Sequence, residues 1–385
     1  TCSIHVSPSW KSRTTATCAA RSVTRAAGRT GFRPLAQIET MLDALVKSEG
    51  APDVVQISGG EPTLHPDFFA VLDAAKSRPI RHLMVNTNGI RIAREPQFAE
   101  QLARYAPGFE IYLQFDSLDD AVHRELRGAE LADIRRRALE QLNRLNISTT
   151  LVVTLKKGLN DGEIGRIIDF ALAQPCVRGV TLQPIQNAGR AENFDPAVHR
   201  LTLTEVRRRI IEQSNVFTAD DIIPVPCNPD ALAMGYALKA DGKVVPLTRL
   251  IDPDTLIQSA RNTIVFERDE SLKEHVFKLF STNHSPQSQA QCLHDLLCCL
   301  PRIAVPDGIR YDNVFRVLIM QFFDAWSFDL RAVKKSCVHI VQPVADHPRV
   351  LGGQVLGFQN MLDQIVLFVE TAARQRAIDV ADEAA

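Results

Sequence analysis

The stretch that decides the fold is Val54–Pro66, VVQISGGEPTLHP. Its apolar start predicts a buried parallel strand. Gly59 and Gly60 then allow a sharp turn and leave main-chain groups uncovered by side chains. Glu61 adds a carboxylate where the strand ends, and Pro62 restricts the exit of the chain. This arrangement suits a small zwitterion, although a strand–turn–helix connection without any ligand is an equally good interpretation of these residues alone.

Outward from this stretch, strand-like and helix-like segments alternate at intervals of about 30 residues, which is typical of a parallel βα array, either a barrel or an open sheet. The expected strands are 54–57, 81–86, 110–115, 148–154 and 179–184, and the expected helices are 34–50, 68–75, 96–105, 132–145 and 163–173.

Polar side chains collect where the expected strands end. In parallel arrays ligands bind at the carboxyl ends of the strands, so these residues predict one shared site. Helix capping by Asp, Ser and Asn is the alternative explanation for some of them. The set comprises Ser58–Glu61, Asn86–Asn88, Gln114, Asp116, Thr154, Gln183 and Gln186.

The bulk properties narrow the class of protein. The chain has 385 residues, a formal net charge of −1 and eight cysteines. This charge does not favour binding to nucleic acid. The sequence contains no apolar run of about 20 residues, so it predicts no membrane-spanning helix. Without an export signal, the cysteines are expected to be reduced thiols, which favours a cytoplasmic protein.

The pattern divides the chain into four parts. Residues 1–31 are rich in Ser, Thr, Arg and Ala and predict an irregular segment. Residues 32–200 carry the βα array. Residues 201–342 predict a mixed α+β extension with a DG hairpin and a strongly apolar strand at 314–323. Residues 343–385 predict a helical tail.

Several stretches together resemble the radical SAM superfamily. GGEP in a βα array is the first, and the C-terminal half adds PVPCNPDALAMGYALKADGKVVPLTR, LLCCLPRI, YDNVFRVLIMQFFDAWSFD and VKKSCVHI. These later stretches resemble the branch that contains the methanogen pterin methylases and the archaeal tetraether lipid synthases. The resemblance covers roughly residues 32–342.

The resemblance implies a partial (βα)6 TIM-type barrel that binds S-adenosylmethionine and a [4Fe–4S] cluster held by a C-x3-C-x2-C loop. Reductive cleavage of S-adenosylmethionine to a 5′-deoxyadenosyl radical would serve C-methylation or carbon–carbon bond formation. A small-molecule or lipid substrate and an electron donor such as flavodoxin or ferredoxin are implied as partners. By position, Gly59, Gly60 and Glu61 would hold the methionyl amine, Gln114 and Asp116 would lie near the ribose, and Gln183 near the adenine, with Asn86 in the same cofactor site.

The sequence departs from the family at the essential loop, because it contains no C-x3-C-x2-C and only Cys18 lies near the expected place. When the third base of each codon is read together with the first two bases of the next codon, the codons of residues 15–25 can encode CNLRCPVCYA. We therefore hypothesise a compensated frameshift over about residues 9–25 that removed the first strand and the cluster loop. The chain as written is then expected to be inactive.

Cys227, Cys298, Cys299 and Cys337 lie in the family-like stretches and are candidate ligands of an auxiliary iron–sulfur cluster. The alternative is that they are buried structural thiols, since free cysteine is among the most buried residue types. Two other functions stay open at this point: a non-catalytic barrel that keeps a nucleoside pocket as a binding scaffold, and an unrelated metal-independent βα-barrel enzyme.

Overall fold

A computed structural model of the chain provides the structure. It describes residues 3–6, 9–10, 31–52, 54–186, 195–225, 229–240, 242–249, 313–322 and 338–341. For residues 3–6, 9–10, 31, 240 and 338–340 only the backbone is described.

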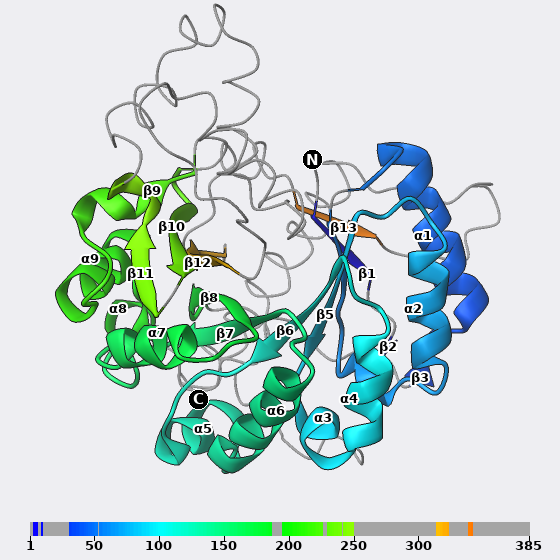
Figure 1. Cartoon of the computed structure of the whole chain (residues 1–385), viewed down its shortest axis with the longest axis horizontal. Coiled ribbons are helices and arrows are strands. Elements are labelled where there is room, and N and C mark those ends of the chain that lie inside the picture. The colour runs from blue at the N-terminus through cyan, green and yellow to red at the C-terminus, as the bar shows by residue number, and fades with distance from the viewer. Residues whose placement is uncertain are drawn as a thin grey trace, which may run out of the picture.

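A single curved sheet with helices along its outer side forms the described part of the molecule (Figure 1). The strands run in the order β11-β10-β12-β8-β7-β6-β5-β4-β1-β13, and β9 pairs with β10. Their bounds are β1 Ser3–Val6, β4 Val54–Ile57, β5 His82–Thr87, β6 Phe109–Gln114, β7 Thr149–Leu155, β8 Val177–Pro184, β9 Ile223–Pro224, β10 Leu232–Ala240, β11 Lys243–Pro246, β12 Val314–Met320 and β13 Val338–Val341. A separate pair joins β2 Ser9–Trp10 to β3 Gly31–Phe32.

The helices follow the strands along the chain. They are α1 Leu35–Glu49, α2 Phe68–Lys76, α3 Ile90–Arg94, α4 Pro96–Ala103, α5 Asp120–Arg127, α6 Ala132–Arg144, α7 Ile164–Leu172, α8 Pro196–His199 and α9 Leu203–Gln213, with short 3-10 turns η1 Pro62–Leu64, η2 Ala219–Asp221 and η3 Leu247–Arg249. Nearly all predicted helices and strands between residues 34 and 213 are thus confirmed to within a few residues. The sequence did not predict α3, α5 or α8.

Period-two alternation along the strands separates the two faces of the sheet. Leu83 and Val85 belong to the large core that also contains helix residues such as Leu72. Met84, between them, joins a separate small cluster with Val54, Tyr112 and Val152 of the neighbouring strands. We call the side that carries this small cluster the inner face. The helices cover the opposite side, so the inner face is the concave interior of the barrel.

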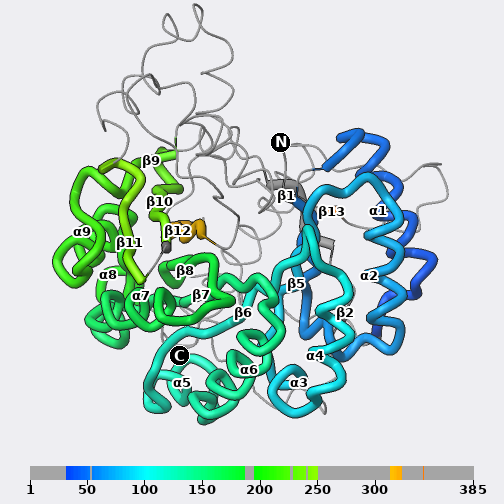
Figure 2. Tube along the Cα trace, in the orientation of Figure 1, coloured from blue at the N-terminus to red at the C-terminus, as the bar shows by residue number. Residues whose placement is uncertain are grey.

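Strands from the C-terminal third extend both edges of this sheet. β12 pairs in parallel with β8, and β13 pairs in parallel with β1 (Figure 2). β13, β1, β4–β8 and β12 are therefore consecutive parallel strands, and β10 adds to β12 in the antiparallel direction. The predicted partial TIM-type barrel is confirmed, and among the described strands it does not close. The proposed division at residue 200 stays a prediction, although one sheet spans it.

The prediction for residues 1–31 was wrong where the structure describes them. Ser3–Val6 forms β1, which lies between β4 and β13 with Val6 opposite Ile57. An apolar-polar tetrapeptide is too short to identify as a strand from its sequence, and only its two neighbours stabilise it. A first strand is therefore present, and the expected loss concerns the loop alone.

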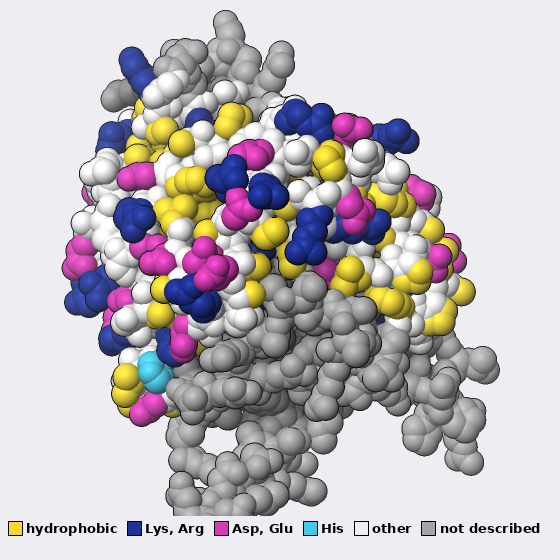
Figure 3. Space-filling model, turned by 90° about the horizontal axis from the view of Figure 1, so that it is seen from below, with side chains coloured by type: hydrophobic (Ala, Val, Ile, Leu, Met, Phe, Trp, Pro, Cys, Tyr) yellow, Lys and Arg dark blue, Asp and Glu magenta, His cyan; other side chains and the backbone are white. Residues whose placement is uncertain are grey.

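The molecular face in Figure 3 mixes basic and acidic side chains. On the exposed side of α6, for example, Arg136 pairs with Asp133 at 2.6 Å and also with Glu140. Such surface pairs contribute little to stability and keep the local charge balanced. Among the described helices none is long and apolar enough to cross a membrane.

Candidate functional site

The turn after β4 exposes its backbone at the carboxyl end of the sheet. Gly59 and Gly60 are both exposed, and Gly59 has a φ of 152°, which residues with a Cβ rarely adopt. Pro62 then begins the 3-10 turn η1, and Glu61 is its N-cap. The backbone groups of this turn are therefore placed where a ligand at the strand ends can reach them.

Glu61 binds groups of its own chain. Its Oε1 accepts hydrogen bonds from the backbone N–H of Thr63 at 3.2 Å, from the Thr63 hydroxyl at 2.6 Å and from the Thr87 hydroxyl at 2.7 Å. Its Oε2 accepts from the backbone N–H of Asn88 at 2.8 Å. The carboxylate therefore ties the turn after β4 to the end of β5.

Three of the predicted amides lie on the inner face at neighbouring strand ends. Gln114 Nε2 donates to Asn86 Oδ1 at 3.3 Å, across β6 and β5. Gln183 Nε2 donates to the Tyr112 hydroxyl, also at 3.3 Å. All three amides are partly exposed. They offer both donors and acceptors to a neutral polar ligand and bring no net charge.

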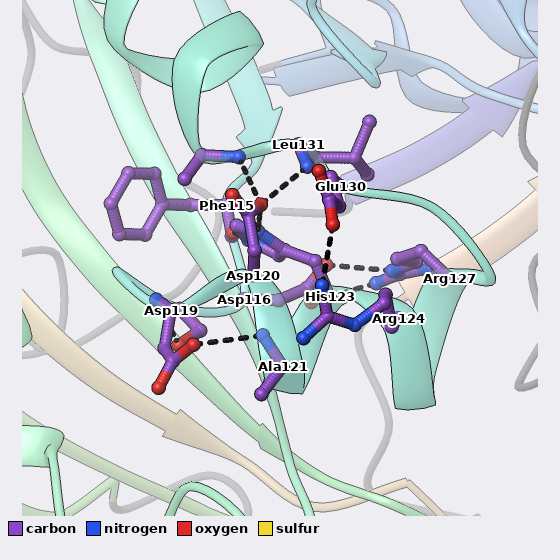
Figure 4. A network of polar contacts seen from close by, with 12 residues as sticks. Phe115, Asp116, Asp119, Asp120, Ala121, His123, Arg124, Arg127, Glu130 and Leu131 are labelled. Atoms are coloured by element: carbon purple, nitrogen blue, oxygen red, sulfur yellow. Dashed lines mark hydrogen bonds and ion pairs between the residues drawn. The ribbon is translucent and has the colours of Figure 1, made fainter.

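Asp116 lies deeper. It is completely buried and has a φ of 64°, a left-handed conformation in which Asp is tolerated better than most residues. Arg127 of α5 binds both carboxylate oxygens, at 2.6 and 2.7 Å (Figure 4). Thr154 donates its backbone N–H to the same group at 3.1 Å. Burial alone would raise the pKa of Asp116, but attraction to Arg127 and these hydrogen bonds lower it.

A second buried arginine lies beside this pair. Arg135 of α6 is 1% exposed and donates to the carbonyl oxygen of Asn88, at the end of β5. Asn160 reinforces the next strand ends, because its amide donates to the carbonyl oxygens of Asp116 at 3.1 Å and Thr154 at 2.8 Å. The ends of β5, β6 and β7 are thus held by side chains as well as by the sheet.

The sequence did not single out Tyr112, Arg127 or Arg135. Tyr112 could have been found, because it lies two residues before Gln114 and so shares its face. The two arginines had no signal of their own. Each comes from a helix that also carries exposed arginine, Arg124 on α5 and Arg136, Arg137 and Arg144 on α6, and only their contacts with Asp116 and Asn88 distinguish them.

The four candidate ligands of an auxiliary cluster, Cys227, Cys298, Cys299 and Cys337, lie outside the described residues. Among the described residues no group of three or more His, Cys, Asp or Glu side chains is arranged to hold a metal ion. Cys176 is buried, and burial raises the pKa of its thiol to about 11, which is the state of a packing residue and not of a thiolate ligand.

Comparison with known proteins identifies the class. The sequence model of the radical SAM superfamily matches residues 16–171. Together with the partial barrel and the GGEP turn, this match identifies residues 16–171 as a region similar to the radical SAM superfamily of enzymes, a family that uses S-adenosylmethionine and a [4Fe–4S] cluster.

Individual relatives are more distant. The 7,8-dihydro-6-hydroxymethylpterin dimethyltransferase of Methanocaldococcus jannaschii is 26% identical over 345 residues, which are 80% of this chain and 67% of that protein. The GTP 3′,8-cyclase of Shewanella denitrificans is 29% identical over 52% of this chain and 57% of its own length. Streptococcus suis SuiB bound to S-adenosylmethionine has a TM-score of 0.46 and 19% identity, covering 54% of this chain and 45% of that one. The chain spans about half to two-thirds of the length of these relatives.

The residues present fit the two cofactors unequally. The exposed glycine turn and the inner-face amides provide polar groups of the kind that bind a methionyl group and a nucleoside. The cluster does not fit, because a site-differentiated [4Fe–4S] cluster is held by cysteine thiolates and the sequence has no C-x3-C-x2-C.

Proposed function

We propose that this chain binds S-adenosylmethionine at the carboxyl ends of β4–β8. The backbone of Gly59 and Gly60 takes the methionyl end, Asn86 and Gln114 lie at the ribose, and Gln183 at the adenine. The observation that carries the proposal is the amide pair Asn86–Gln114 on the inner face, one strand from the glycine turn. Amide oxygens accept from hydroxyls and amines, and amide nitrogens donate to ring nitrogens.

The reaction class we propose for this site is C-methylation or carbon–carbon bond formation on a small-molecule or lipid substrate. The pterin dimethyltransferase, which matches 80% of this chain, supports methylation and favours a pterin-like heterocycle among small molecules. A flavodoxin or ferredoxin as electron donor and a cytoplasmic location stay predictions. Because the cluster ligands are missing, we propose that the chain as written binds the nucleoside without cleaving it.

Calorimetric titration with S-adenosylhomocysteine, which keeps the amino-acid ammonium and carboxylate and the adenosine but has a thioether in place of the methylated sulfonium, tests the binding proposal. The wild-type chain should bind it, and Gln183→Ala should weaken binding by about tenfold, the equivalent of about 1.4 kcal/mol. Gln101→Ala is the matched control, since Gln101 is an exposed glutamine on α4. Equal affinity of the Gln183 and Gln101 variants would contradict the placement.

The missing loop specifically favours a second function, a binding scaffold that keeps the nucleoside pocket without catalysis. The two functions are distinguished by anaerobic incubation with S-adenosylmethionine and a strong reductant. Formation of 5′-deoxyadenosine and methionine by the chain as written would exclude the scaffold and would contradict its proposed inactivity.

A further inference from the structure

Two sets of polar contacts hold the carboxyl ends of four neighbouring strands, and we call them together the rim belt. One set joins β4 to β5 and α6, and the other joins β6 to β7. Between the two sets, the charge of Arg135 attracts the carboxylate of Asp116. The residues of the rim belt are Glu61, Thr87, Asn88, Arg135, Asp116, Arg127 and Thr154.

The first half of the rim belt fastens β4 to β5 and to α6. Glu61 accepts the Thr87 hydroxyl at 2.7 Å and the Asn88 N–H at 2.8 Å, and Arg135 donates to the carbonyl oxygen of the same Asn88. The peptide groups on both sides of Asn88 are therefore held, one by a carboxylate and the other by a guanidinium. This contact set fixes the backbone from which the inner-face residue Asn86 projects.

The second half fastens β6 to β7. Arg127 bonds to both oxygens of Asp116 and also donates to the Thr154 hydroxyl at 3.1 Å. Asp116 is 0% exposed, whereas Gln114, two residues earlier, is partly exposed on the inner face. The carboxylate of Asp116 is therefore covered by Arg127, and no part of it is exposed on the surface that Gln114 borders.

The charges of the rim belt balance, with two carboxylates and two guanidiniums. Removing charges from water is costly, and a buried ion pair is often no more stabilising than apolar side chains of the same volume. Such a pair does fix the position of the carboxylate, because bidentate hydrogen bonding to arginine is possible only over a narrow range of carboxylate positions. We therefore expect the ion pairs of the rim belt to fix the positions of the strand ends.

We propose that Glu61 and Asp116 are positioning residues that hold the strand ends and do not touch the nucleoside. This proposal rests on the proposed function for its ligand. Direct contact then falls to the Gly59–Gly60 backbone and to the inner-face amides. The proposal departs from the roles that the family resemblance implies for these two carboxylates.

Hydrogen exchange of the ligand-free protein provides the first test. Asp116→Asn and Arg127→Lys should each speed exchange of the Thr154 amide by about tenfold or more, as expected for loss of about 1.4 kcal/mol of local protection. Asp133→Asn, a change in an exposed ion pair on α6, is the control and should leave that exchange rate unchanged. Unchanged exchange in both the Asp116 and Arg127 variants would overturn the proposal.

Binding of adenosine, 2′-deoxyadenosine and 3′-deoxyadenosine provides the second test. If Asp116 only positions the strand ends, Asp116→Asn weakens all three nucleosides by the same factor, and Arg127→Lys does likewise. If Asp116 contacts the ribose, Asp116→Asn will not weaken binding of the nucleoside that lacks the contacted hydroxyl. In that case Arg127→Lys will bind all three nucleosides like wild type. This pair of results would overturn the proposal. A wild-type chain that binds none of the three refutes the proposed function, and the exchange experiment still decides the role of the rim belt.

Discussion

His82 Nε2 lies 3.2 Å from Glu110 Oε2, and both side chains are almost completely buried on the inner face near the amino ends of the strands. Glu110 also accepts the Thr150 hydroxyl. His82 Nδ1 has no hydrogen-bond partner among the described residues, which fits a neutral imidazole that donates through Nε2. Burial lowers the pKa of His82 and alone would raise that of Glu110, but hydrogen bonds from His82 and Thr150 and attraction to Arg316 lower the pKa of Glu110 to about 2.

This pair predicts acid sensitivity. A carboxyl whose pKa falls from 4.5 in the unfolded chain to about 2 on folding stabilises the protein above pH 4.5 and loses that contribution as the pH falls toward 2. At pH 3.5 the loss from Glu110 is about 1 kcal/mol. Urea unfolding of wild type and Glu110→Gln at pH 7 and pH 3.5 measures it. The variant should lose less stability between the two pH values, and equal losses would contradict the low pKa.

The pairing of β12 with β8 makes a second prediction. A Cβ added to Gly179 of β8 would lie 2.5 Å from the carbonyl oxygen of Arg316 on β12. Gly179→Ala should therefore force the two strands apart and lower the free energy of unfolding by about 1–3 kcal/mol. Hydrogen exchange in residues 314–320 should rise as well.

Gly162→Ala is the control for this substitution, because a Cβ there meets nothing within 4 Å. It should leave the free energy of unfolding within about 0.5 kcal/mol of wild type. If both alanine variants are equally stable, β12 does not lie against β8, and the C-terminal strands are not part of the barrel sheet.

The cysteines predict what anaerobic reconstitution with iron and sulfide should produce. Any visible iron–sulfur absorption of the chain as written should depend on Cys227, Cys298, Cys299 and Cys337, and it should vanish when all four are changed to serine. Cys18→Ser should have no effect, because one thiol does not hold a cluster. Absorption that survives the fourfold change but is lost with Cys18 would show that the N-terminal segment does bind iron.

The frameshift hypothesis makes a prediction about the gene itself. Codons for Ala16, Ala20 and Val23 begin with GC, GC and GT, and cysteine codons begin with TG. The shifted frame therefore spells three cysteines only if the codon before each of these residues ends in T. Resequencing the DNA for residues 5–30 checks all three bases. A different base at any one of them removes a cysteine and refutes the hypothesis.

Much of the fold was predictable because local patterns and tertiary structure agree over residues 34–213. The strand β4, for example, was predicted with its observed bounds, because a short apolar run that ends in two glycines is typical of a buried parallel strand. α3 and α5 were missed because they are short, and α5 is strongly polar. β1 was missed because four residues carry too little pattern, and only pairing with β4 and β13 makes them a strand.

The sequence by itself determined the resemblance to the radical SAM superfamily and the strand ends at which we propose the site, because GGEP and the alternation of strands and helices are local patterns. It also determined that the cluster loop is missing. Only the tertiary structure decided what individual side chains do there. Gln114 and Asp116 are two residues apart, yet Gln114 borders the inner face while Asp116 is buried against Arg127. The left-handed turn at Asp116 and the Arg127 side chain supplied by α5 accompany the burial of that carboxylate, and neither is a property of the local sequence.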